Sequence, residues 1–243
     1  MSRIAIAIAA LFLASVAALA NMPGTGWILG KGSPEVELTA SSSSSTTATS
    51  YTFSSQSFGP ASSLRYIIVS VTGRSGAGVS ISSVTIGGVG ATQIVYAKPN
   101  TDAANYSHVG IYIAAVPSGT SGSVVVSLTG GSLLRCGIGV YRVDQMSSPS
   151  AFSTATDTDA SNPQTASISV TSGGFAIGVA YSQNGASWSG LSESYEINMA
   201  TTGSDTNDAT GALSTNTGTS SISVSMTAGL GTRNALAVAS WGP

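Results

Sequence analysis

Residues 123–143 read Ser-Val-Val-Val-Ser-Leu-Thr-Gly-Gly-Ser-Leu-Leu-Arg-Cys-Gly-Ile-Gly-Val-Tyr-Arg-Val, and this stretch decides the fold class. Apolar residues recur at every second position on both sides of the pair Gly130-Gly131. A period of two is typical of a strand that buries one face, and paired glycines supply the positive φ angles of a tight hairpin turn. The stretch therefore predicts two antiparallel strands joined by a short turn.

The same pattern returns near the C-terminus, 98 residues further along the chain. Seven positions agree in kind: Val124, Val126, Leu128, Thr129, Arg135, Ile138 and Val140 match Ile222, Val224, Met226, Thr227, Arg233, Leu236 and Val238. Two upstream segments match at larger offsets: Ile67, Val69 and Val71 with Phe175, Ile177 and Val179, and Gly88-Val89 with Gly190-Leu191. A unit of about 100 residues is one domain's worth of strands. We therefore predict two copies of one β unit, residues 50–146 and 147–243, which form two sandwiches or the halves of one.

Short runs rich in β-branched and aromatic residues alternate with turn residues from Tyr51 to the end of the chain. This spacing is typical of a β-sandwich, and no window outside the N-terminus has the 3.6-residue period of an amphipathic helix. We predict an all-β protein, a sandwich of jelly-roll type with two pseudo-repeated halves. An extended or helical apolar arm precedes it.

Residues 1–20 resemble a secretory signal. Arg3 precedes an uncharged apolar stretch that ends in Ala18-Leu19-Ala20, and a basic start, an apolar middle and a small-residue exit define such signals. The stretch is at the lower limit of length for a helix that crosses a bilayer. Three interpretations stay open: a signal removed before Asn21, a retained apolar anchor, or an uncleaved segment that packs inside an oligomer.

Residues 21–49 are predicted to be an extended arm and linker, because the Ser/Thr tract Ser41–Thr47 has no apolar side chain to bury. An apolar arm before a flexible tract can add a strand to a neighbouring subunit. We therefore predict an assembly arm in a homo-oligomer. Its apolar residues are Trp27, Ile28, Leu29, Val36 and Leu38.

Charge is scarce in this chain. Charged residues make up 7% of it, whereas an ordinary soluble domain has about 25%. Eight basic and ten acidic residues without a basic cluster argue against nucleic-acid binding. The neutral, hydroxyl-rich surface that replaces the charge costs little to desolvate against another subunit. The composition therefore favours a component of an assembly.

Known catalytic motifs are absent from the sequence, which has one histidine, His108, and one cysteine, Cys136. A single cysteine excludes an intramolecular disulfide and a cysteine-based metal site, and its alternating apolar neighbours predict that it is buried. Glu193 and Glu196 suggest the paired carboxylates of a glycosidase. Residues three apart on a strand point to opposite faces unless a bulge intervenes. We therefore expect no enzyme.

Two oxygen-rich segments are candidates for Ca²⁺ binding. Carboxylate and carbonyl oxygens are the ligands that Ca²⁺ takes, but Asp and Asn also favour turns because their side chains bond to nearby backbone. The turn interpretation is preferred, and no other cofactor is expected. The calcium candidates are Asp157, Asp159, Asp205, Asn207 and Asp208.

Trp188 is the candidate ligand contact. It lies in the run Gly185-Ala-Ser-Trp-Ser-Gly190, where small turn residues are expected to leave the indole exposed. An exposed aromatic ring has an apolar face on which a sugar can stack. Surface glycans are therefore a second class of partner.

Four segments carry a resemblance to a known group of proteins: Tyr66-Ile-Ile-Val-Ser-Val, Ile81-Ser-Ser-Val-Thr-Ile-Gly-Gly-Val, Ile111-Tyr-Ile-Ala-Ala-Val-Pro and Ala239-Ser-Trp-Gly-Pro243. Together they resemble a loosely defined group of β-rich, virion-associated proteins of tailed bacteriophages, notably those of alphaproteobacterial hosts. The resemblance implies a virion component such as a capsid-decoration, fibre or collar protein. It supplies no functional residues.

The leading prediction is a non-enzymatic virion structural protein whose partners are other virion subunits. The signal-like N-terminus departs from that picture, because virion proteins assemble in the cytoplasm. The alternative is an exported cell-surface filament subunit or carbohydrate-binding sandwich, from which residues 1–20 are removed. A third hypothesis is a secreted polysaccharide-active enzyme that uses Glu193 or Glu196.

Overall fold

A computed structural model gives the fold. The described residues contain seventeen strands and no helix, which confirms the predicted all-β class. It follows that none of them forms a helix suited to crossing a membrane. Of residues 208–215 and 220–228 only the backbone is described. The structure describes residues 33–76, 78–98, 106–158, 162–182, 186–199, 208–215, 220–228 and 234–243.

The first half of the chain forms nine strands: β1 (Glu35–Ser44), β2 (Ser50–Ser57), β3 (Tyr66–Ser75), β4 (Ser80–Ile86), β5 (Val89–Gly90), β6 (Thr92–Ala97), β7 (Tyr106–Ala115), β8 (Ser121–Thr129) and β9 (Leu133–Asp144). The second half forms eight: β10 (Ser153–Asp157), β11 (Gln164–Val170), β12 (Phe175–Ser182), β13 (Ala186–Ser189), β14 (Ser192–Asn198), β15 (Asp208–Thr215), β16 (Ser220–Ala228) and β17 (Ala235–Trp241).

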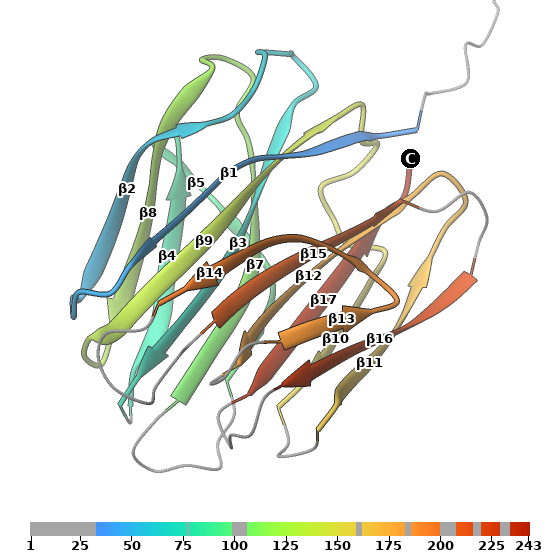
Figure 1. Cartoon of the computed structure of the whole chain (residues 1–243). Helices are drawn as coiled ribbons and strands as arrows, with labels where there is room; N and C mark the ends of the chain where they lie inside the picture. The colour runs from blue at the N-terminus through green and yellow to red at the C-terminus, as the bar shows by residue number, and fades with distance from the viewer. Residues whose placement is uncertain are drawn as a thin grey trace, which may run out of the picture. The chain divides into compact units, whose positions relative to one another are not determined.

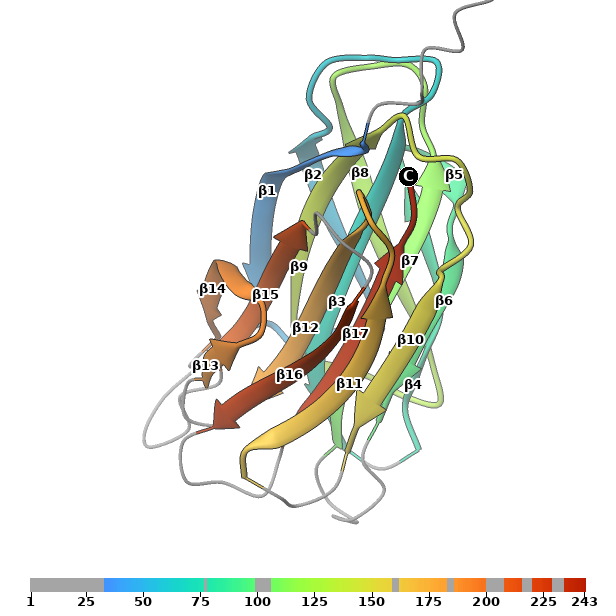
Figure 2. The same ribbon diagram turned by 90° about the vertical axis from the view of Figure 1, so that its right-hand side faces the viewer.

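These strands make four antiparallel sheets, which Figure 1 shows as successive layers. The first sandwich consists of an outer sheet, β2-β8-β4-β5, and an inner sheet, β1-β9-β3-β7-β6. The second sandwich consists of an inner sheet, β10-β17-β12-β15-β14, and an outer sheet, β11-β16-β13. Figure 2 shows the second outer sheet lying over its inner sheet. The two inner sheets face each other, and the two outer sheets face solvent.

Each sandwich is a jelly roll. The edge strand β6 is set aside, and the other eight strands of the first sandwich are counted from 1 to 8 along the chain. The inner sheet, β1-β9-β3-β7, then has the order 1-8-3-6, and the outer sheet, β2-β8-β4-β5, has the order 2-7-4-5. This is the double Greek-key arrangement. The second sandwich repeats this order but has no counterpart of β5 among the described residues. The two pseudo-repeated halves expected from the sequence are thus two sandwiches, each with a core of its own.

The 98-residue offset holds for the closing strands, but the upstream match is wrong by one residue. Val69 pairs with Val140 in the first sandwich, and Gly178 pairs with Val238 in the second. Val69 therefore corresponds to Gly178 and not to Ile177. A shift of one residue moves a side chain to the other face of a sheet. Accordingly, Val69 lies in the core of the first sandwich, whereas Ile177 lies between the sandwiches.

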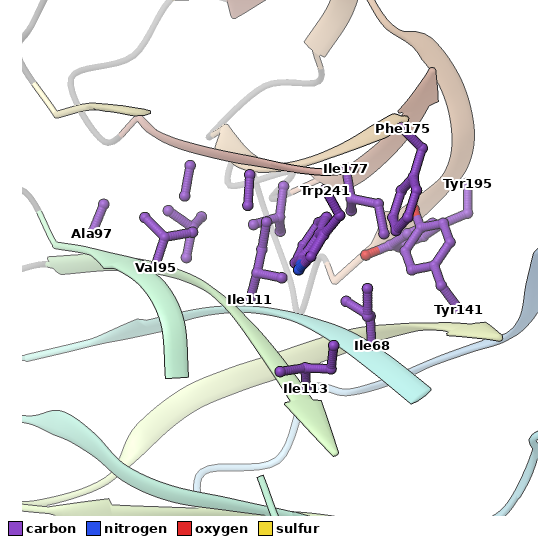
Figure 3. Close-up of a cluster of buried hydrophobic side chains, with 14 of the residues drawn as sticks. Ile68, Val95, Ala97, Ile111, Ile113, Tyr141, Phe175, Ile177, Tyr195 and Trp241 are labelled. Carbon is purple, nitrogen blue, oxygen red and sulfur yellow. The ribbon is translucent and has the colours of Figure 1, made fainter. Parts of the chain in front are cut away.

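A central core joins the two inner sheets (Figure 3). The rings of Phe175 and Trp241 stack there with their centroids 5.1 Å apart, and the Trp241 indole donates a hydrogen bond to Pro149 O at 3.1 Å. Strand β1 lies against β14, and β6 lies against β10. Since β1 is equivalent to β10 and β6 to β14, exchanging the two sandwiches interchanges these two edge contacts. The interface therefore has pseudo-twofold symmetry, like that of an isologous dimer.

Part of the predicted linker is a strand. Residues 35–44 form β1, which pairs with β9 at the edge of the first inner sheet, so the first β unit begins at Glu35 and not at residue 50. Serine and threonine suit this edge because their hydroxyls bond to β2. The Thr39 hydroxyl donates to Ser57 O at 2.7 Å, and the Ser42 hydroxyl donates to Gln56 Oε1 at 2.9 Å. Hydrogen bonds thus hold the Ser/Thr part of this strand, while Val36 and Leu38 nearer its start pack against apolar side chains.

Candidate functional site: a cleft at one end of the first sandwich

A cleft of about 440 Å³ opens at one end of the first sandwich. It lies between the β2–β3 loop, the β4–β5 turn, the β7–β8 loop and the start of β8, and both loops lie at the same end of the sandwich (Figure 1, Figure 2). Its size is that of a site for a small ligand. The lining residues are Phe58, Gly87, Gly88, Val89, Val116, Pro117, Ser118, Ser121, Gly122 and Ser123.

Two glycines let the backbone close around the ring of Phe58. A Cβ atom on Gly122 would lie 2.6 Å from Phe58 Cε2 and 3.1 Å from Gly87 Cα. A Cβ atom on Gly87 would lie 3.1 Å from the same ring, and Gly87 has a φ of 59°, which favours glycine. The ring itself is only 1% exposed. The base of the cleft is therefore backbone and a buried aromatic edge, without bulky side chains.

Arg65 fixes the two loops that form the cleft. Its side chain is 1% exposed, and all of its partners are backbone carbonyls. Burial, the largest effect, lowers the pKa of the guanidinium, which nevertheless stays charged because its ordinary pKa is so high. The carbonyl oxygens and their distances are Val116 2.7 Å, Phe58 3.3 Å, Gly59 3.0 Å, Pro60 2.8 Å, Ser118 2.9 Å and Gly119 2.7 Å.

The lining of the cleft is neutral. None of its residues is charged, three serines provide hydroxyl groups, and Val89, Val116 and Pro117 provide apolar surface. Val89 is 42% exposed and is one of three large apolar side chains exposed in the described part of the chain. The guanidinium of Arg65 already serves six carbonyls, so it is not offered to a ligand. The lining of the cleft therefore combines hydroxyl and apolar surface without a charged side chain.

The cleft is formed by elements in which the two sandwiches differ. Residues 58–65 connect β2 to β3, whereas only residues 171–174 connect β11 to β12. Strand β4 continues through a Gly87-Gly88 turn into β5, whereas β13 is followed by two residues and then β14. Binding residues are concentrated on loops that a rigid scaffold positions. The added loop and strand are what distinguish the first sandwich from its copy.

His108 lies in a buried polar network. It is fully buried in β7, its Nε2 is 2.6 Å from Ser75 Oγ, and its Nδ1 is 2.5 Å from Tyr96 Oη. The Ser75 hydroxyl donates to Gly76 O at 2.7 Å, so it accepts a hydrogen bond from His108 Nε2–H. The direction of this hydrogen bond is opposite to that in a catalytic pair, where the serine hydroxyl donates to a histidine base. Burial, and then the charge of Lys98, lowers the pKa of His108 to about 3.

Glu193 and Glu196 lie on the same face of β14, although residues three apart on a regular strand lie on opposite faces. A bulge interrupts the pairing of β14 with β15 between Glu193 and Tyr195, so the face reversal expected over three residues does not apply. Burial, and then the charge of Glu196, raises the pKa of Glu193. Both carboxylates are exposed, and neither lines the cleft.

Of the calcium candidates, only the side chain of Asp157 is described together with a contact. Its Oδ2 accepts a hydrogen bond from the backbone N–H of Thr165 at 2.7 Å, which joins β10 to β11. Asp159, Asp205 and Asn207 lie outside the described residues, and so does the side chain of Asp208. Within the described ranges no three His, Cys, Asp or Glu side chains come together as a metal site. Calcium binding stays a prediction.

Trp188 is not the exposed platform that the sequence suggested. It is half-buried in β13 and packs on the core of the second sandwich. Two of its ring atoms lie 2.9 and 3.0 Å from the position that a Cβ of Gly178 would occupy. The indole therefore fills space that Val69 fills at the corresponding position of the first sandwich. The small residues around Trp188 suggested an exposed ring. The space that the ring fills is left by Gly178, which lies on β12 in the facing sheet.

The assembly arm is described only in part. Trp27, Ile28 and Leu29 lie outside the described residues. Val36 and Leu38 belong to β1 and pack against the central core of their own chain, so the structure does not leave them free for a neighbouring subunit. Cys136 is a free, fully buried thiol, as predicted, and burial raises its pKa.

Sequence reasoning missed the residues that build the cleft, among them Phe58, Arg65 and Gly122. The one local signal was Arg65, a lone charge between a polar loop and an apolar strand in a chain with few charges. No protein-family model and no curated protein matches this chain.

Proposed function

We propose that the protein is a non-enzymatic structural protein displayed on the exterior of a phage particle. The observation that carries the proposal is the surface chemistry of the two joined sandwiches. Every described arginine is mostly buried, and Lys98 is half-buried with its ammonium on Val79 O at 3.0 Å. In the described part of the chain, the remaining surface is therefore hydroxyl-rich and nearly free of cations. Such a surface suits permanent neighbours in an assembly.

The internal partners of the basic side chains support this interpretation. Arg135 donates to Met199 O at 3.0 Å across the interface between the sandwiches. Arg142 forms an ion pair with Asp144 on the same strand. These charges stabilise the fold itself and give no electrostatic patch for steering a charged substrate or a nucleic acid.

Purified particles test the proposal. We expect the protein in stoichiometric amounts by mass spectrometry, with a first residue of Met1 or Ser2, and antibody labelling on the particle surface. Absence from particles, together with a mature N-terminus at Asn21, would contradict it. That result would select the second candidate, an exported carbohydrate-binding sandwich, which the neutral cleft favours.

A further inference from the structure

We infer that the cleft of the first sandwich binds a terminal sugar of a neutral glycan. The inference rests on the proposed function, because a displayed protein that holds a surface glycan attaches its particle to a cell. It also assigns the binding to a site away from Trp188. The cleft has the volume of a small-ligand site, about 440 Å³, and the exposed side chain of Val89 is part of its lining.

The lining selects the chemical class of the ligand. A pyranose presents apolar C–H faces and a rim of hydroxyls, and the cleft offers Val89, Val116 and Pro117 to the faces. Ser118, Ser121 and Ser123 offer hydroxyls that both donate and accept hydrogen bonds. A purely apolar ligand would leave these hydroxyls without partners, which costs affinity.

The absence of charge in the lining disfavours charged ligands. An anionic sugar would need a cation, and none lines the cleft. The nearest guanidinium in the loops, Arg65, has its donors on six backbone carbonyls and is 1% exposed. A cationic ligand would likewise meet no carboxylate. The ligand is therefore neutral.

Rigidity is the third argument. Arg65 ties the β2–β3 loop to the β7–β8 loop, and Gly87 and Gly122 are held against Phe58. A pre-organised cleft loses little conformational entropy when a ligand binds. Weakly held hydroxyl ligands gain most from such a site, since each of their hydrogen bonds contributes little net free energy.

The test uses the purified full-length protein on an array of neutral and acidic glycans, followed by calorimetry with the neutral glycan that binds best. The cleft variant combines Ser118→Ala, Ser121→Ala and Ser123→Ala. The matched control combines Ser82→Ala, Ser167→Ala and Ser169→Ala, three exposed strand serines outside the cleft. A second cleft variant, Val89→Asp, changes one exposed residue and so leaves the core intact. Thermal unfolding verifies that all variants fold.

We expect binding to a neutral glycan that salt does not weaken, at least a tenfold loss in both cleft variants and no change in the control. The inference is overturned if no glycan binds, if only acidic glycans bind, if the control loses as much as the cleft variants, or if the cleft variants bind normally. Localisation is measured separately in particles. Loss of glycan binding by a particle-borne protein refutes the cleft alone, and glycan binding by a protein absent from particles refutes the proposed function alone.

Discussion

The hydroxyl of Tyr195 lies 2.6 Å from the hydroxyl of Ser70, across the interface between the two sandwiches. Tyr195 comes from β14 of the second sandwich, and its ring rests on Gly139 of β9 in the first, where no Cβ atom intervenes. At the position equivalent to Gly139 the second sandwich has Ala237, 98 residues later. The pseudo-twofold interface is thus asymmetric in detail, and one large side chain enters a slot made of small ones.

Replacing Gly139 with alanine should destabilise the joined sandwiches. The new Cβ would overlap the ring of Tyr195, and overpacking of this kind costs about 1–3 kcal/mol. Urea unfolding of Gly139→Ala measures the loss. Gly90→Ala is the matched control, because a Cβ at Gly90 meets nothing within 4 Å. Equal losses in the two variants would show that overlap with the Tyr195 ring does not decide the effect.

Arg65→Lys should weaken the first sandwich although the charge is kept. One ammonium group cannot reach six carbonyls, and each buried carbonyl left without a donor costs about 1–3 kcal/mol. We expect a loss of at least about 2 kcal/mol in the free energy of unfolding. Arg142→Lys is the control: its one charged partner, Asp144, is a single carboxylate that an ammonium can also meet, so it should lose less stability than Arg65→Lys. A fully stable Arg65→Lys protein would contradict the structural role of the guanidinium.

Stability should fall as the pH drops below about 6.5 because of His108. Burial lowers the pKa of His108 to about 3 in the folded protein, so between these two pH values the unfolded chain binds the proton more readily. Above about pH 6.5 His108 is neutral in both states and does not lower the free energy of unfolding. Below that pH the free energy of unfolding decreases by up to about 1.4 kcal/mol per pH unit, down to about pH 3. Urea unfolding at pH 7 and pH 5 measures it. In His108→Gln this part of the pH dependence should vanish, and an unchanged slope would assign it to other groups.

Trp188→Ala should lower stability and leave glycan binding intact. The indole fills the space above Gly178 in the second sandwich, and removal of a partly buried aromatic ring costs about 2–4 kcal/mol. Thermal unfolding measures the loss, and calorimetry with the neutral glycan provides the second readout. If the variant stays folded but loses the glycan, binding belongs to the second sandwich and not to the cleft.

Alternation made the fold class and the closing strands predictable. Val124 and Val126 alternate on β8, and Ile138 and Val140 alternate on β9. The structure places all four in one core. The same signal fails for central strands that are apolar on both faces, because either register satisfies the pattern. This is why Val69 was matched with Ile177 when its counterpart is Gly178.

The cleft could not be predicted in this way. Phe58, Gly87 and Gly122 are distant in sequence and meet only when three connections converge at one end of the sandwich. Arg65 has backbone carbonyls as partners, and carbonyls leave no trace in a sequence. Strand β1 was missed for a related reason, since hydrogen bonds from Thr39 and Ser42 hold its Ser/Thr tract.

The pseudo-twofold arrangement of the inner sheets limits the valency of this protein. The inner sheet of each sandwich covers the inner sheet of the other within one chain. Neither inner sheet is therefore available to bind a third sandwich. Each chain therefore behaves toward its neighbours as a finished dimer. Through that face it terminates an assembly and cannot propagate one. Growth into a filament would have to use the outer sheets, the strand edges or the N-terminal segment, and these are the surfaces on which neighbouring subunits should be sought.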